Sequence, residues 1–293
     1  MGWRNVVVSK PSKLDYNIGY MVVRSVASTV KVHLSEISML IVENTACSIT
    51  CALMSKLTQE KIKVIFCDER RNPSSELTAY YGSHDCSQRL KNQIEWQEDA
   101  MCSAWTLIVA EKIKNQMRLL EEFGLPEAQK LGDYIDKIEF YDESNREGQA
   151  AKVYFNALFG KRFSRSDDNA VNAALNYGYS LILSCFNRAV VCSGYLTQLG
   201  LFHCNMYNQY NLSCDLMEPL RPLVDFRVKT LEPLNTFETA EKRAVVTIFE
   251  SELKIDGRNN TLDNAIKLYS KSVFNAIEEN DMSLIKFPAL TFD

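Results

Sequence analysis

Residues 105–120 read WTLIVAEKIKNQMRLL, and this stretch decides how the larger part of the chain folds. Its apolar residues recur every three or four positions, at Trp105, Val109, Ile113, Met117 and Leu120. Such spacing lines up one apolar face along an α-helix. The pattern stops before Gly124, and Pro126 follows, which is typical of a helix end. The stretch therefore predicts a long helix with one buried face.

The same periodicity continues to the C-terminal end of the sequence. A comparable stripe is formed by Leu262, Ile266, Tyr269, Val273 and Ile277. Further helical patterns lie near residues 127–139, 146–159, 168–194, 215–229 and 238–254. Residues 86–293 are therefore expected to form an all-α domain.

The first 67 residues have a different pattern, in which apolar and polar side chains alternate. From Leu14 to Val23 the residues of one face would be Leu14, Tyr16, Ile18, Tyr20 and Val22, as in a single strand. Other β-like runs lie at residues 30–34, 36–43 and 61–67, with one helix at 48–57. Residues 1–85 should form a β-rich, sandwich-like domain, so the predicted fold class is α+β.

The composition is that of an ordinary folded protein, with 293 residues, 46% hydrophobic and 24% charged. No apolar run approaches the roughly 20 residues that a membrane-spanning helix needs, and the N-terminus does not resemble a secretory signal. The nine cysteines are scattered, which favours reduced thiols. We therefore expect a cytoplasmic protein without a membrane partner.

The formal net charge of −4 argues against simple electrostatic binding of nucleic acid. Binding to DNA would need a segregated basic surface, an oligomer or a partner protein. No phosphate-binding loop, dinucleotide fingerprint or serine-hydrolase elbow is present in the sequence.

Glu147 is the first candidate for chemistry, because it lies on the expected inward stripe of the helix at 146–159. A carboxylate on a buried stripe requires a cation, a salt bridge or a metal ion opposite. Asp215 and Glu218 are spaced to share one face of a helix and could also bind a metal, or could simply complement the dipole at a helix N-terminus.

Glutamate oxygens together with the imidazole of His203 would suit Mn²⁺ or Mg²⁺ better than zinc. Lys161, Arg162 and Arg165 surround Phe163 just after the 146–159 helix. They could bind DNA phosphates, or equally complement the C-terminal dipole of that helix.

Four ordered motifs of the sequence resemble the CRISPR-associated protein 1 family, in particular its type II-A branch. They are Arg146-Glu-Gly-Gln-Ala-Ala-Lys-Val-Tyr-Phe155, Asn172-Ala-Ala-Leu-Asn-Tyr-Gly-Tyr-Ser-Leu-Ile182, Leu199-Gly-Leu-Phe-His203 and Asp215-Leu-Met-Glu-Pro-Leu-Arg-Pro222. The chain departs from the family pattern at Tyr195-Leu-Thr-Gln198, where many members have Asp-Pro, and at Glu218, where the family often has Asp.

The resemblance implies that Glu147, His203 and Glu218 are the catalytic metal ligands, with Asp215 and Arg221 as auxiliary residues and Lys161, Arg162 and Arg165 as DNA contacts. It implies dimerisation through residues 1–85, and catalysis with metal and DNA binding in residues 86–293. The implied activity is a metal-dependent DNA integrase and endonuclease, which joins captured fragments into the CRISPR array by attack of a 3′-hydroxyl on a phosphodiester.

The partners that the resemblance implies are double-stranded DNA of the fragment and the repeat, a second copy of the chain and a dimer of CRISPR-associated protein 2. The RNA-guided effector nuclease and the ring-forming accessory protein of type II-A systems are further partners of that branch. Two alternatives remain open at this point: a structure-selective DNA nuclease of repair, and a DNA-capture scaffold with a degenerate site.

Overall fold

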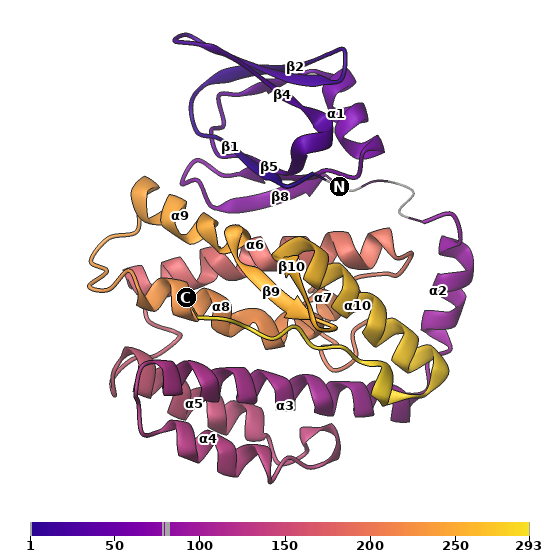
Figure 1. Ribbon diagram of the computed structural model, residues 1–293, viewed down its shortest axis with the longest axis vertical. Coiled ribbons are helices and arrows are strands. Elements are labelled where there is room, and N and C mark those ends of the chain that lie inside the picture. The colour runs from indigo at the N-terminus through magenta and orange to yellow at the C-terminus, as the bar shows by residue number, and fades with distance from the viewer. Residues whose placement is uncertain (1, 78, 80–82, 293) are drawn as a thin grey trace. The chain divides into compact units, whose positions relative to one another are not determined.

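The computed structural model describes residues 2–77, 79 and 83–292 (Figure 1). The chain divides into two compact units, residues 1–82 and 83–293. The sequence placed this boundary near residue 85. The first unit is rich in strands and the second is mainly helical, which confirms the predicted α+β class.

The described residues of the first unit form two four-stranded sheets. One has the order β1-β5-β7-β8, with β1, β5 and β7 parallel, and the other has the order β4-β3-β2-β6. Leucine, isoleucine, valine and methionine side chains from both sheets pack with α1 into one core, which is the sandwich-like arrangement expected from the sequence. The elements are β1 (Arg4–Val8), β2 (Ser12–Asn17), β3 (Tyr20–Ser25), β4 (Thr29–His33), β5 (Ile37–Val42), β6 (Ser48–Ile49), α1 (Cys51–Gln59), β7 (Lys63–Cys67) and β8 (Pro73–Leu77).

The single strand predicted from Leu14 to Val23 is wrong, because these residues form the hairpin of β2 and β3. The backbone turns at Ile18 and Gly19, both with positive φ, as two-residue hairpin turns require. Asn17 pairs with Tyr20 across this turn, and Tyr16 pairs with Met21. The core-facing side chains therefore lie at even-numbered positions before the turn and at odd-numbered positions after it. Met21 is buried, whereas Ile18 and Tyr20, which were expected on that face, are exposed. Ile18 is 86% exposed at the tip.

In the second unit, the stripe from Trp105 to Leu120 lies within α3, the longest of the described helices. Helices α4 and α5 pack against α3, while α6 contacts α7, α8, α9 and α10 (Figure 1). The helices are α2 (Cys86–Ile94), α3 (Glu98–Glu122), α4 (Ala128–Ile135), α5 (Arg146–Phe159), α6 (Ala170–Cys192), α7 (Asn211–Met217), α8 (Arg221–Lys229), α9 (Thr239–Val246) and α10 (Leu262–Glu279). Short 3-10 turns include η2 (Phe140–Asp142), η3 (Glu218–Leu220) and η4 (Thr247–Glu250).

One hairpin interrupts the helices, so the second unit is not purely α. Strands β9 (Glu252–Ile255) and β10 (Arg258–Thr261) pair in antiparallel fashion. The predicted helix at 238–254 is therefore too long, since α9 ends at Val246. In β9, Leu253 and Ile255 are buried and the residues between and before them are exposed, which is the alternation of a strand. Asp256 and Gly257 make the turn with positive φ, and an Asp-Gly pair between such runs is a typical hairpin signal.

Two further expectations concern the whole chain. All nine cysteines are free thiols, as their scattered spacing suggested. Within the described residues, no helix combines the length and the apolar character needed to cross a bilayer.

Candidate metal centre

Glu147 is fixed at the first turn of α5 by the residues that begin this helix. The side chain of Asn145 accepts a hydrogen bond from the backbone nitrogen of Gly148 at 3.1 Å. Asp142 accepts two more, from the backbone nitrogens of Arg146 at 2.8 Å and Glu147 at 3.0 Å. Acceptors at these positions satisfy N–H groups that a helix start leaves free, so the position of Glu147 is well determined.

Glu218 lies where α7 passes through η3 into α8. Pro219 has no N–H to continue the α-helical bonding, which fits the tighter turn at this point. The carbonyl of Pro219 accepts a buried hydrogen bond of 2.9 Å from Asn115 of α3. Glu218 is 4% exposed, and its Oε1 accepts a hydrogen bond of 2.8 Å from Arg221 Nε. This carboxylate is therefore buried, it lies beside α3, and its Oε1 is paired with Arg221.

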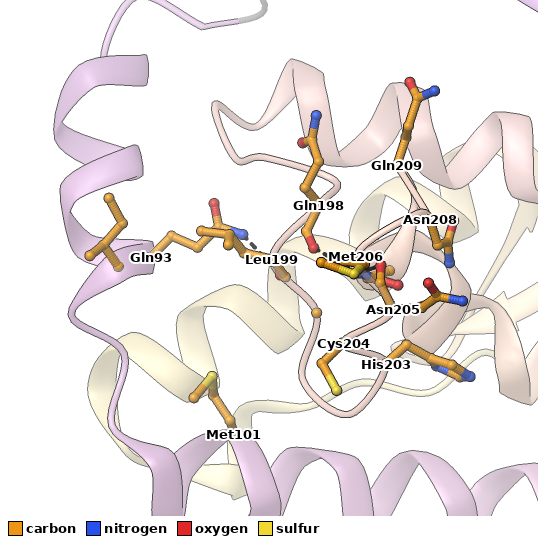
Figure 2. Close-up of a pocket in the computed structure, with 13 residues that line it drawn as sticks. Gln93, Met101, Gln198, Leu199, His203, Cys204, Asn205, Met206, Asn208 and Gln209 are labelled. Carbon is orange, nitrogen blue, oxygen red and sulfur yellow. Dashed lines mark hydrogen bonds between the residues drawn. The ribbon is translucent and has the colours of Figure 1, made fainter.

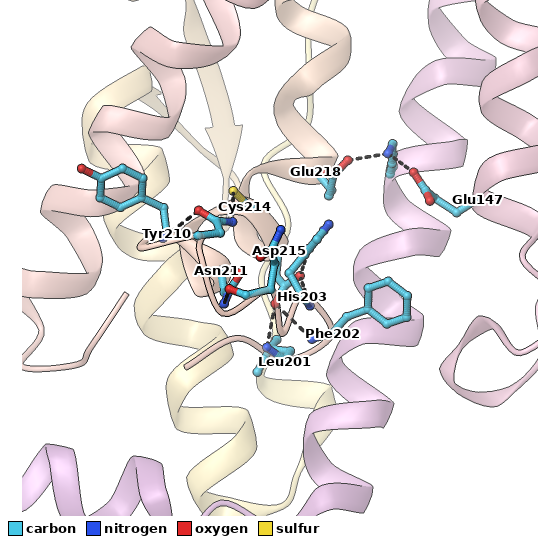
Figure 3. A network of polar contacts seen from close by, with 12 residues as sticks. Glu147, Leu201, Phe202, His203, Tyr210, Asn211, Cys214, Asp215 and Glu218 are labelled. Carbon is cyan, nitrogen blue, oxygen red and sulfur yellow. Dashed lines mark hydrogen bonds and ion pairs between the residues drawn. The ribbon is translucent and has the colours of Figure 1, made fainter. Parts of the chain in front are cut away.

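Lys112 of α3 connects the two glutamates. Its Nζ forms ion pairs with Glu147 Oε1 and with Glu218 Oε2 (Figure 3). Burial alone would raise the pKa of Glu218, but the charges of Arg221 and Lys112 outweigh it and lower that pKa to about 2. Lys112 remains charged for a related reason: burial lowers its pKa, and the two carboxylates raise it by more.

A carboxylate on the inward stripe of α5 was expected to need a cation, a salt bridge or a metal ion opposite, and Lys112 is the cation that the structure places there. The sequence signal on α3 is the helical spacing of Glu111, Lys112, Asn115 and Gln116, which does not single out Lys112; the structure shows that all four are buried. Their spacing gives the helix a polar stripe beside its apolar one.

His203 is held by Asp215, which lies fully buried in α7. Asp215 Oδ1 lies 2.5 Å from His203 Nδ1 (Figure 3). The carboxylate also accepts hydrogen bonds from the backbone nitrogens of Leu201 at 2.6 Å, Phe202 at 3.1 Å and His203 at 3.2 Å. The hydrogen bond with Asp215 raises the pKa of His203, and burial opposes this effect.

The close fit of this loop requires glycine at position 200. A Cβ atom there would lie 2.3 Å from the His203 carbonyl oxygen and 2.8 Å from Asp215 Oδ2. On the other side, the ring of Phe202 stacks on Trp105 of α3 with centroids 4.5 Å apart. Trp105 also meets the edge of the His203 ring at 5.9 Å. Glycine, aspartate and tryptophan thus fix the imidazole against α3.

The structure brings the predicted residues together in two groups rather than one. Glu147 and Glu218 share the Lys112 ammonium, whereas His203 pairs with Asp215. The charge of Glu218 contributes to the raised pKa of His203, so the groups are within electrostatic range. Across the described residues, however, no three histidine, cysteine, aspartate or glutamate side chains lie close enough together to hold a metal ion.

The residue types nevertheless fit a hard divalent cation. Two carboxylates already converge on a positive charge, and the bond from His203 Nδ1 to Asp215 leaves Nε2 as the nitrogen for a metal. Carboxylate and imidazole donors suit Mg²⁺ or Mn²⁺.

The three basic candidates differ in their surroundings. Lys161 and Arg162 are exposed just after α5 and have no ion-pair partner among the described residues. The Arg165 guanidinium instead donates hydrogen bonds to the side-chain oxygens of Asn172 and, at 2.7 Å, Asn176. Its guanidinium also lies over the ring of Tyr179, 5.4 Å from the centroid. Arg165 is therefore used in holding α6, whereas the other two cations are free to meet phosphate.

A pocket of about 550 Å³ opens beside His203 (Figure 2). Its described lining contains no lysine, arginine, aspartate or glutamate. Amide side chains dominate its polar part, namely Gln93, Gln198, Asn205, Asn208, Gln209 and Asn211, and Met101, Leu199 and Met206 add apolar surface. This lining suits neutral groups that both donate and accept hydrogen bonds.

Several solved structures have a similar fold. One, described as a casposase bound to integration product, has a TM-score of 0.76 and 17% identity, covering 97% of this chain and 93% of that chain. Another, a Cas6-RT-Cas1–Cas2 complex, has a TM-score of 0.73 and 16% identity, covering 98% of this chain but 36% of that longer chain. At such identities the likeness concerns the fold.

The family is established by sequence. The model of the family described as CRISPR associated protein Cas1 matches residues 6–259, and the chain belongs to this family. A relative from Neisseria meningitidis serogroup C (strain 8013), named CRISPR-associated endonuclease Cas1, is 35% identical over 248 residues, covering 84% of this chain and 80% of the relative.

Proposed function

We propose that this chain is a metal-dependent DNA integrase and endonuclease of CRISPR adaptation. It joins captured DNA fragments into the CRISPR array by attack of a fragment's 3′-hydroxyl on a phosphodiester. The observation that carries the proposal is the convergence of Glu147 and Glu218 on one cation, beside an imidazole fixed by Asp215, in a chain of the Cas1 family. Family membership disfavours a general repair nuclease, and the ordered site disfavours a degenerate scaffold.

The proposed metal ligands are Glu147, His203 and Glu218, with Mg²⁺ or Mn²⁺ as the ion. When bound, the ion would polarise the scissile phosphate and stabilise negative charge on the entering and leaving oxygens. Asp215 fixes the imidazole tautomer through Nδ1. Arg221 orients Glu218 through its 2.8 Å hydrogen bond.

The surroundings of this site suit a DNA substrate. The exposed Lys161 and Arg162 can bind backbone phosphates as salt-sensitive contacts. The amide-lined pocket beside His203 offers donors and acceptors of the kind that bind the edges of unpaired bases. We assign Arg165 a smaller share of the DNA contact, because it is already bonded within the fold.

The assembly in which the chain works is part of the proposal. Residues 1–85 mediate dimerisation, and the dimers bind a dimer of CRISPR-associated protein 2 in the cytoplasm. The RNA-guided effector nuclease and the ring-forming accessory protein act with this assembly. Such a composite surface can gather positive charge that a chain with net charge −4 does not itself provide.

The decisive experiment measures joining of a DNA fragment into a supercoiled plasmid that bears a repeat, with Mg²⁺ or Mn²⁺ and the small partner protein. We expect E147Q, H203A and E218Q each to lower the joining rate by about 100-fold or more. E143Q is the matched control, since Glu143 is an exposed glutamate just ahead of α5. Unchanged joining in E147Q and H203A would refute the metal assignment, while cleavage without joining would favour a nuclease.

A further inference from the structure

The ammonium of Lys112 lies where the proposed metal ligands converge. The residue is 6% exposed, and its side chain reaches from α3 to carboxylates on α5 and η3. Glu218 Oε2 is buried, and the ion pair with Lys112 is the contact that compensates its charge. Burying a lysine is costly unless it is paired, which indicates a specific role for this cation.

The charges around this lysine are already balanced without any metal. Lys112 and Arg221 supply two positive charges, and Glu147 and Glu218 supply two negative ones. A divalent cation entering this set would bring two further positive charges close to two existing ones. The ammonium and the metal would also require the same carboxylate oxygens.

We propose that Lys112 is an internal counter-cation that holds Glu147 and Glu218 together in the metal-free protein and competes with the divalent ion for them. This inference rests on the proposed metal site. With a metal ion bound, Glu147 and Glu218 would serve as its ligands, and the Lys112 ammonium would then pair with a DNA phosphate in place of these carboxylates. Lys112 thereby weakens metal binding in the absence of DNA and links metal binding to the arrival of the substrate.

The test measures the affinity of the full-length protein for Mn²⁺ alone, without DNA, from the electron paramagnetic resonance signal of free Mn²⁺. We expect K112M and K112Q to bind Mn²⁺ at least about tenfold more tightly than the unchanged protein. K114M is the matched control: Lys114 lies on the same helix but is 44% exposed and pairs with Glu111 instead. Equal or weaker binding by both Lys112 variants would overturn the inference.

Removal of the ammonium also leaves two facing carboxylates, so stability provides a second measurement. The metal-free variants should melt at a lower temperature, and Mn²⁺ should raise their Tm by more than it raises that of the unchanged protein. If the variants fold only with Mn²⁺, the inference is supported. If Mn²⁺ restores neither folding nor Tm, it is refuted.

The inference and the metal site can fail separately. If E147Q and E218Q bind Mn²⁺ as well as the unchanged protein does, the proposed metal site is wrong. If these two variants lose affinity while K112M and K112Q gain none, the metal site stands and Lys112 is not a competitor. In the double variant K112M/E147Q, the gain in Mn²⁺ affinity expected for K112M should disappear, because one of the two carboxylates that would bind the ion is gone.

Discussion

Asp215 holds both the side chain and the backbone of His203: its Oδ1 lies 2.5 Å from the His203 imidazole Nδ1 and 3.2 Å from the His203 backbone nitrogen. Oδ2 meanwhile accepts from Leu201 and Phe202. One buried carboxylate therefore folds the loop and orients the ring at the same time. Its oxygens are used within the protein, so we propose that Asp215 positions the histidine and does not itself bind the metal.

The first prediction concerns D215N. An amide NH₂ cannot accept hydrogen bonds, so the variant leaves buried donors unpaired and should lose about 2 kcal/mol of unfolding free energy or more. The pKa of His203 should fall towards its ordinary value, because the hydrogen bond that Asp215 accepts from the imidazole Nδ1 is the main cause that raises it. Chemical denaturation gives the first quantity, and an NMR titration gives the second. D133N, at an exposed aspartate of α4, is the control; an unchanged His203 titration in D215N would contradict the assigned role.

E218Q tests the buried carboxylate between two cations. At pH 7 the variant leaves Arg221 without its carboxylate partner and leaves Lys112 with Glu147 alone, and we expect a loss of about 3–5 kcal/mol of unfolding free energy. The pKa of Glu218 is about 2, below its ordinary value of 4.5. Its charge therefore stabilises the fold above pH 4.5, and this contribution is lost as the pH falls through 2.

The difference in unfolding free energy between E218Q and the unchanged protein should accordingly shrink by about 2 kcal/mol from pH 7 to pH 3. Urea denaturation at the two pH values measures it. E279Q, at an exposed glutamate near the end of α10, should show neither the loss nor its dependence on pH. A difference that stays constant with pH would mean that the charge of Glu218 does not stabilise the fold.

Much of the fold could be predicted from periodicity, because the long stripes of α3 and α10 each persist over several turns. The hairpins were harder to predict. Apolar alternation continues through the turn at Ile18 and Gly19 without a break, so the pattern alone could not show that the chain reverses. At Asp256 and Gly257 the turn signal was present, but the neighbouring helical pattern obscured it.

The site was predictable to a different degree. Glu147 could be nominated from its own helix, because a carboxylate on an inward stripe demands a partner. Lys112 could not be chosen as that partner. A lysine on a helix normally extends into solvent, and its burial here depends on η3 and α5 both meeting α3, which is a property of tertiary packing.

Asp225 should make stability depend on pH in the opposite direction to Glu218. It is buried in α8 and accepts hydrogen bonds from Tyr154, at 2.8 Å, and from Tyr179. Burial raises its pKa from 3.8 to about 6, against the influence of both hydroxyls. The protonated carboxyl therefore stabilises the fold fully below pH 3.8. This contribution is lost as the pH rises through 6, which lowers the unfolding free energy by about 3 kcal/mol.

D225N removes this titration. The stability of the unchanged protein should fall towards that of D225N between pH 4 and pH 7, because only the Asp225 carboxyl loses a proton in this range. Thermal or urea denaturation across pH 4–7 measures this convergence. Parallel stability curves for the two proteins would show that Asp225 does not titrate in this range.

The basic residues after α5 should separate into a DNA-binding pair and a structural residue. Lys161 and Arg162 are exposed, so K161A and R162A should each weaken DNA binding and reduce the slope of log affinity against log salt by about 0.9 on duplex DNA. Neither change should alter stability by more than about 0.5 kcal/mol.

Arg165 is hydrogen-bonded to Asn172 and Asn176 and lies over Tyr179. R165A should therefore lower the unfolding free energy by about 1–3 kcal/mol and change the salt slope little. Fluorescence anisotropy with labelled duplex at several salt concentrations, combined with urea denaturation, distinguishes these effects. If R165A instead lowers the salt slope by about 0.9 and leaves stability unchanged, Arg165 is a phosphate contact.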